Sequence, residues 1–220
     1  LISAPVVDSG GRLVGQITVD DIVGVIQEEG EEDILALAGV SDAGRDAGVW
    51  DVARSRLPWL VVNTLTAATA ASVIGAFQAE ISKLVTLAIL MPVVASLGGN
   101  AGTQTLAVAV RALAARELTA ANAVRIVLRE MAVGLVNGGV LALIMGAATF
   151  VFFRDPMLCL TIGLALIINL FMAALAGILV PLALDRLERD PAVSSSVFVT
   201  FVTDFMGFLS FLGLAGLILL

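Results

Sequence analysis

The feature that most constrains the fold is a series of long apolar runs that begins near residue 57. A transmembrane helix needs about 20 mostly apolar residues, whereas a transmembrane strand needs about ten of alternating polarity, and the runs match only the helix. The chain is 59% hydrophobic and 14% charged, against about 25% charged in an average soluble domain. The sequence therefore predicts an all-α polytopic membrane protein. We expect five spans, at 57–77, 84–110, 131–153, 157–181 and 195–220.

Charge separates the start of the chain from the rest. Residues 1–51 hold 11 of the 19 acids and 2 of the 12 Lys and Arg residues, a net charge of −9, whereas the remainder has a net charge of +2. An acidic segment of this kind repels nucleic acid, so we expect no nucleic-acid partner. Metal cations and the lipid bilayer are the partners that this charge pattern and hydropathy favour.

The basic residues also predict how the chain crosses the membrane. Eight bases flank the spans on one side and two on the other, and the more basic side of a membrane protein faces the cytoplasm. We therefore expect a cytoplasmic N-terminus and, after five spans, a C-terminus outside. The eight bases are Arg54, Arg56, Arg111, Arg116, Arg125, Arg129, Arg186 and Arg189; the two are Lys83 and Arg154.

Several catalytic chemistries are excluded by composition. The chain has no histidine and a single cysteine, Cys159, so it lacks the residues for a disulfide, a zinc site of Cys and His, or a histidine-based triad. An intramembrane aspartyl protease needs two aspartates at membrane depth, and only Asp204 lies clearly inside an apolar span. We expect that the chain is not an enzyme.

The first part of the chain predicts a small α/β unit. Residues 4–26 resemble two short strands joined by the turn "DSGGR" and followed by a helix, with Thr18 or Asp20 as its N-cap. Because the chain begins with Leu1 and this unit is too small to fold well alone, we expect residues 1–33 to be the end of a longer domain. Residues 34–56 would form a connecting helix, and residues 57–220 the membrane domain.

The last span carries the residue that most directly indicates function, Asp204. A carboxylate inside the membrane costs a few kcal/mol (about 2.5 or more) on insertion scales, so its default interpretation is functional. The neighbouring small and polar residues recur at spacings of three or four, which would place them on one stripe of the helix. The alternative is an acid satisfied by nearby hydroxyls or kept protonated. The stripe comprises Ser196, Thr200, Thr203, Asp204 and Gly207.

The second span contains the unusual stretch "SLGGNAGTQT" at residues 96–105. Pro92 and three glycines would weaken the helix here, and non-helical backbone at this depth is tolerated where it lines a watery cavity. The alternative is close helix packing by the pair Gly98 and Gly102. Packing does not explain Asn100 and Gln104, which need partners or water. For the isolated amides in other spans, Asn137 and Asn169, we expect interhelical hydrogen bonds.

These oxygen-bearing side chains indicate a hydrated divalent cation. Magnesium is usually held by one or two carboxylates while it keeps several waters, and zinc would favour the His or Cys ligands that are scarce here. The residue types alone do not separate Mg²⁺ from Mn²⁺ or Co²⁺.

Four stretches resemble the MgtE family of magnesium channels. They are "PVVDSGGRLVGQITVDDIVGVIQEE", "MPVVASLGGNAGTQTLAVAVRALAARELT", "VLREMAVGLVNG" and "DPAVSSSVFVTFVTDFMGF". The first is similar to the end of a CBS domain, so the resemblance implies that residues 1–33 are a CBS remnant and 34–56 a plug-type connecting helix. It also implies a homodimer in a bacterial inner membrane, with five membrane helices per subunit and a pore at the interface.

The resemblance also implies roles for individual residues. Asp204 corresponds to the central magnesium-binding residue, Thr200 lies one turn toward the cytoplasm, and Ser196 stands where some members carry asparagine. Asp190 matches an acid at the cytoplasmic mouth. Pore-lining or supporting positions in the second span include Gly98, Gly99 and Asn100. Glu28 and Glu29 belong to acids placed where cytosolic Mg²⁺ would gate the full-length protein.

The function that the residues and the resemblance predict together is a magnesium-selective channel. A proton- or sodium-coupled divalent cation transporter, in which Asp204 would titrate during the cycle, remains the alternative.

Overall fold

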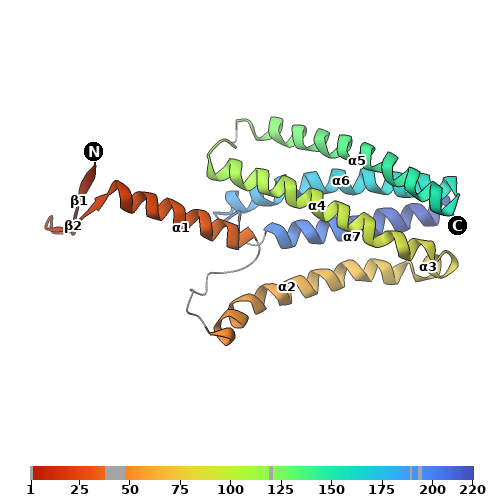
Figure 1. The fold of residues 1–220 in the computed structure, drawn as a ribbon, viewed down its shortest axis with the longest axis horizontal. Helices are drawn as coiled ribbons and strands as arrows, with labels where there is room; N and C mark the ends of the chain where they lie inside the picture. Colours follow the sequence, from red (N-terminus) through yellow and green to blue (C-terminus); the bar gives the residue numbers. More distant parts are fainter. Residues whose placement is uncertain (1, 38–47, 119–120, 189, 193–194) are drawn as a thin grey trace.

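The computed structural model describes residues 2–37, 48–118, 121–188, 190–192 and 195–220, and it is almost entirely helical (Figure 1). A two-stranded antiparallel sheet at the N-terminus is followed by seven helices within these ranges. Five of the helices are long and apolar enough to cross a membrane. The elements are β1 Ser3–Val7, β2 Leu13–Thr18, α1 Val19–Leu37, α2 Val49–Ala76, α3 Gln78–Lys83, α4 Thr86–Ala114, α5 Ala123–Phe153, α6 Pro156–Arg186 and α7 Ser195–Ile218.

The five predicted spans are confirmed as α2, α4, α5, α6 and α7, but two of them begin earlier than expected. Helix α2 begins at Val49 rather than residue 57, and α5 begins at Ala123 rather than residue 131. In both cases charged residues interrupt the first turns. A helix keeps its backbone hydrogen bonds outside the bilayer as well as inside it. Hydropathy therefore predicts the part of the helix that lies in the bilayer, and not the residue at which the helix begins.

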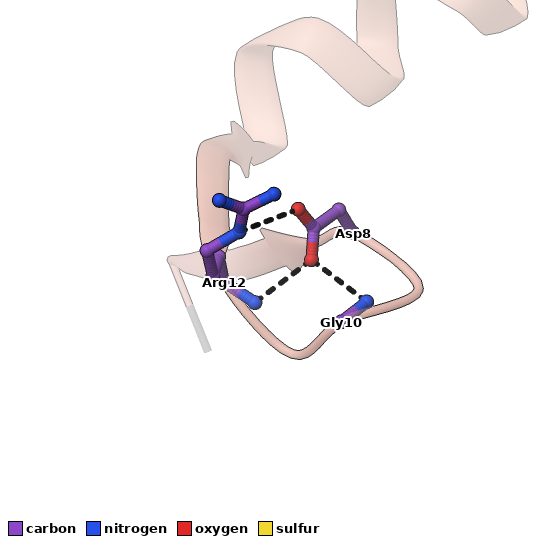
Figure 2. A network of polar contacts seen from close by, with 3 residues as sticks. All are labelled: Asp8, Gly10 and Arg12. Carbon is purple, nitrogen blue, oxygen red and sulfur yellow. Dashed lines mark hydrogen bonds and ion pairs between the residues drawn. The ribbon is translucent and has the colours of Figure 1, made fainter.

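The N-terminal hairpin turns at Asp8, whose carboxylate organises the loop (Figure 2). Asp8 Oδ1 accepts hydrogen bonds of 2.9 Å from the backbone N–H groups of Gly10 and Arg12, and Oδ2 pairs with Arg12 Nε at 3.2 Å. The Arg12 N–H group is the main reason that the pKa of this carboxyl lies below its usual value. Gly11 takes a positive φ of 78°, which glycine adopts without strain.

Helix α1 crosses the predicted domain boundary. It runs without a break from Val19 to Leu37, past the expected division between residues 33 and 34, and residues 38–47 of the predicted connector 34–56 lie outside the described residues. Only the end of α1 reaches the membrane helices, where Ala36 and Leu37 pack against the cluster of Leu106, Val110, Ala176, Ala192 and Val199. The division into a CBS remnant, connector and pore domain stays a prediction.

Helix α6 is the centre of the membrane part. It packs against α4, α5 and α7, and it has the highest mean hydropathy of the five long helices and the largest buried share. Asp155 caps its first turn, accepting hydrogen bonds of 2.9 and 3.2 Å from the N–H groups of Met157 and Leu158. Helix α2, in contrast, packs mainly against α7 and is largely exposed.

The described residues among the eight bases on the predicted cytoplasmic side belong to parts of the chain that meet at one end of the bundle, while Arg189 lies outside the described residues. The start of α2, the connection from α4 to α5 and the connection from α6 to α7 lie at the same end as α1, while α3 and the C-terminus lie at the other (Figure 1). This arrangement agrees with the predicted topology, although the cytoplasmic and outer sides themselves stay predictions.

Candidate ion pathway

Asp204 lies near the middle of α7, an apolar helix of 24 residues, and its side chain is half-buried. It is the only acid between Ser195 and Ile218. Thr200, one turn earlier, and Ser196, two turns earlier, are also partly exposed. A column of two hydroxyls and one carboxylate thus follows one side of α7, and none of these three side chains is sealed inside the subunit.

The other two members of the predicted stripe are buried. Thr203 and Gly207 are buried, and the Thr203 hydroxyl donates a 2.9 Å hydrogen bond to the backbone carbonyl of Thr200. The predicted stripe therefore has a partly exposed part, with Ser196, Thr200 and Asp204, and a buried part, with Thr203 and Gly207. A shift of one residue turns a side chain by about 100° around a helix, so Thr203 lies at the edge of the stripe farthest from Asp204, where it packs toward Gly99 and Gly102 of α4.

The stretch 98–104 is helical, contrary to the expectation of a weakened helix. Helix α4 is continuous from Thr86 to Ala114, with Pro92 inside it. The Thr103 hydroxyl donates a 2.9 Å hydrogen bond to the carbonyl of Gly99 in the preceding turn. The glycines act instead as places where neighbouring helices come close, which confirms the packing alternative.

Gly98 and Gly102 are the two positions of closest approach on α4. A Cβ atom on Gly98 would lie 2.8 Å from Cγ of Asn169 in α6, and one on Gly102 would lie 2.6 Å from Cγ1 of Val199 in α7. Both distances are shorter than an ordinary van der Waals contact, so neither position has room for a Cβ atom. The predicted interhelical hydrogen bond of Asn169 is confirmed, because its Nδ2 donates to the carbonyl of Val94 in α4 at 2.9 Å.

Gly99 lies where the second-span stretch 98–104 meets the polar residues of α7. A Cβ atom on Gly99 would lie 3.9 Å from Oγ1 of Thr203, so this part of α4 faces α7 next to Asp204. Asn100 follows directly and is exposed. The structure therefore brings Gly98, Gly99 and the middle of α7 to the same level of the bundle, with an amide and a carboxylate left accessible beside them.

Three predicted site residues lie elsewhere. Asp190 is exposed just before α7, where its Oδ1 accepts a 2.8 Å hydrogen bond from the N–H of Ala192. Glu28 and Glu29 are exposed in the middle of α1, the helix that projects from the membrane helices in Figure 1. Within the described ranges, no group of three or more His, Cys, Asp or Glu side chains is arranged to hold a metal ion.

The amides Gln104 and Asn137 face a groove between α4 and α5. The groove has a volume of about 330 Å³, and Arg129 and Glu130 also line it. Asn137 is exposed and makes no hydrogen bond to another group in the described part of the chain, so the interhelical bond expected for it is not found.

Comparison with known proteins finds a family match that includes most of α4 and α7. The sequence profile of the MgtE family, described as divalent cation transporters, matches residues 91–214, which is more than half of the chain and includes both helix segments described above. The chain belongs to the MgtE family.

Three curated MgtE proteins are similar over nearly the whole chain, and each is named magnesium transporter MgtE. The protein of Enterococcus faecalis is 37% identical over 92% of this chain and 45% of its own length. The Thermus thermophilus protein is 36% identical over 98% and 48%, and the Bacillus subtilis protein is 31% identical over 97% and 48%. The chain thus spans about half the length of these curated relatives.

The MgtE match also covers the residues whose importance the sequence left open. Gly98, Gly102 and Asn169 all lie within 91–214, and so does Gly207, which packs on Asn169. Sequence reasoning expected a hydrogen bond from Asn169 but did not indicate that this residue touches both α4 and α7. Its 75-residue separation from Val94 leaves no periodic signal that could have revealed the contact.

Proposed function

We propose that this chain forms the membrane part of a magnesium-selective channel, in which Asp204 recognises the hydrated ion. The observation that carries the proposal is the partly exposed carboxylate of Asp204 in the middle of the apolar helix α7. A carboxylate at this depth is costly unless it faces water or an ion. The relatives named as magnesium transporters support Mg²⁺ as the ion.

The residues around Asp204 suit an ion that keeps its water. Thr200 and Ser196 offer hydroxyls on the same side of α7, and Asn100 offers an amide from α4. Mg²⁺ sheds its water reluctantly and prefers oxygen neighbours. One carboxylate with several neutral oxygen groups therefore fits recognition through the hydration shell, with Asp204 balancing charge and the other groups accepting or donating hydrogen bonds.

A homodimer would complete the path. In one subunit Asn100 is exposed and Asp204 is only half-buried, so the candidate site is open on one side. The outer face of α4 also exposes Ser96 and Thr103. A second copy related by two-fold symmetry would place the same groups opposite them, and a dication would offset the repulsion between the two Asp204 carboxylates.

Gating by cytosolic Mg²⁺ would act through α1. The end of this helix packs on the cluster that includes Val199 of α7, while Glu28 and Glu29 are exposed earlier in the same helix. Mg²⁺ bound between such acids and other cytosolic parts would hold α1 in place by screening their repulsion. Asp190, exposed near the same end, would attract cations to the cytoplasmic mouth.

The test is Mg²⁺ influx into proteoliposomes that contain a fluorescent Mg²⁺ indicator, for the unaltered chain, Asp204→Asn and Asp204→Ala. We expect influx in the unaltered chain and its loss in both variants, because neither retains the negative charge. Asp185→Asn is the matched control, since it removes an exposed acid from the last turn of α6. Full influx in both Asp204 variants would contradict the proposed role of this residue.

The same vesicles separate a channel from the coupled transporter. A channel carries Mg²⁺ down its electrochemical gradient, so its influx at a fixed membrane potential does not change when a pH or sodium gradient is imposed or removed. A strict dependence on either gradient would replace the channel with coupled transport.

A further inference from the structure

The side chain of Asn169 occupies the junction of three helices. It is fully buried in the middle of α6. Its Nδ2 donates a 2.9 Å hydrogen bond to the carbonyl of Val94 in α4. Cβ atoms on Gly98 in α4 and Gly207 in α7 would approach Asn169 Cγ to 2.8 and 3.3 Å. The amide therefore fills a space that two glycines on different helices leave open.

This amide is only partly satisfied. Asn169 Oδ1 is buried and has no hydrogen-bond partner among the described residues. A buried acceptor without a partner is destabilising by about 1–3 kcal/mol, so an apolar side chain of similar size would stabilise the packing better. A polar residue that lowers stability at a tightly packed position calls for a role other than packing.

Both helices that Asn169 touches line the candidate pathway. Gly98 directly precedes Gly99, which faces Thr203, and Gly207 lies less than one turn beyond Asp204 on α7. Any change in the volume or hydrogen bonding of Asn169 would move α4 and α7 relative to each other at this level, because the interior is close-packed and neighbouring atoms cannot absorb the change.

We propose that Asn169 is a positioning residue that fixes the distance between α4 and α7 beside Asp204, and thereby sets which cations pass. This inference rests on the proposed function, since it concerns the selectivity of the same path. Asn169 itself does not touch the ion. It acts through the Val94 carbonyl on one side and through contact with Gly98 and Gly207 on the other.

The first experiment compares Asn169→Ala with Asn137→Ala in proteoliposomes made from the full chain. Asn137 is an exposed asparagine in α5, so its replacement removes the same amide without disturbing the junction. Influx of Mg²⁺ and of Ca²⁺ is measured with separate indicators. We expect the ratio of Mg²⁺ to Ca²⁺ influx to fall roughly tenfold in Asn169→Ala, equivalent to about 1.4 kcal/mol, and to remain unchanged in Asn137→Ala.

A second experiment tests the contact directly through a double variant. Gly98→Ala alone would force its methyl group into the amide of Asn169 and should lower both the thermal midpoint and Mg²⁺ influx. In Asn169→Ala the space is free, so adding Gly98→Ala should cost little stability and should recover part of the selectivity. Gly139→Ala in α5, where a Cβ atom would meet nothing within 4 Å, is the matched control for glycine replacement.

The outcomes separate the positioning role from the proposed function. If the unaltered chain carries Mg²⁺ but Asn169→Ala keeps its ion ratio, positioning by Asn169 is wrong while the channel proposal stands. If Gly98→Ala is equally harmful with and without Asn169, the contact is not the cause and the proposal is also overturned. If the unaltered chain carries no Mg²⁺, the proposed function fails and the positioning role fails with it.

Discussion

Gly177 in α6 lies against the backbone of α4, so its replacement with alanine measures how closely these two helices must pack. A Cβ atom at this position would lie 2.8 Å from the carbonyl oxygen of Gly102, 2.8 Å from Cβ of Thr105 and 3.1 Å from the nitrogen of Leu106. Ordinary contacts begin at 3.4 Å, so the helices would have to separate by about 0.6 Å, the difference between 3.4 and 2.8 Å.

The expected cost follows from a comparison of two glycines. Overpacking a close-packed interior typically destabilises a protein by about 1–3 kcal/mol. Alanine is also a better helix former than glycine, by about 1 kcal/mol, but this gain is shared by Gly139→Ala, whose new methyl group meets no atom within 4 Å. The difference in the free energy of unfolding between Gly177→Ala and Gly139→Ala therefore isolates the overpacking, at about 1–3 kcal/mol.

The assay is equilibrium unfolding of the two purified variants in mixed detergent micelles, followed by circular dichroism. Mg²⁺ influx is measured on the same preparations, because the separation at Gly177 would also shift Gly102, which packs against Val199 and Thr203 of α7. If Gly177→Ala proves as stable as Gly139→Ala, the close approach of α4 and α6 is not a constraint, and the packing argument fails.

Two further predictions concern parts away from the junction. Asp155→Ala should lower the free energy of unfolding by about 1 kcal/mol, because the N–H groups of Met157 and Leu158 lose their acceptor; equilibrium unfolding against Asp185→Ala checks this, and equal stability of the two would contradict it. The Thr18 hydroxyl donates a 2.6 Å hydrogen bond to the Asp21 carboxylate and lowers the pKa of that carboxyl below its usual value of 3.8. The charged carboxylate therefore stabilises the start of α1 at pH values above 3.8, and this contribution is lost as the pH falls through the lowered pKa. A carboxyl titration followed by NMR should show the pKa returning toward 3.8 in Thr18→Val, and an unchanged titration would refute the assignment.

Hydropathy predicted the five membrane helices because the bilayer imposes one strong requirement, a run of apolar side chains around a self-satisfied backbone. The helix starts were harder, since Val49 and Ala123 begin turns that charged residues interrupt, outside the continuous apolar runs. The N-terminal strands were also predicted, because the Asp8 turn and Gly11 carry local signals that do not depend on distant contacts.

The candidate pathway was only partly predictable. Asp204 stood out because a carboxylate is rare in an apolar helix, but the direction of Thr203 depends on which side of α7 meets α4. Glycines in the second span looked like helix breakers because intrinsic propensity is a local property. Their actual role depends on partners in α6 and α7 that are far away in the sequence, and tertiary contacts override propensity in such places.

The central position of α6 has a consequence for how the chain is made. Synthesis runs from the N-terminus, so α4 is completed at Ala114 before the first residue of α6, Pro156, has been added. Until α6 enters the bilayer, Gly98 lacks the Asn169 side chain that packs beside it, and the Val94 carbonyl has no Asn169 to donate to it. Gly102 waits longer, because its nearest neighbour is Val199 of α7. Assembly of the bundle is thus a late event in translation, and a nascent chain stopped before residue 156 would lack α6, the helix against which α4, α5 and α7 pack.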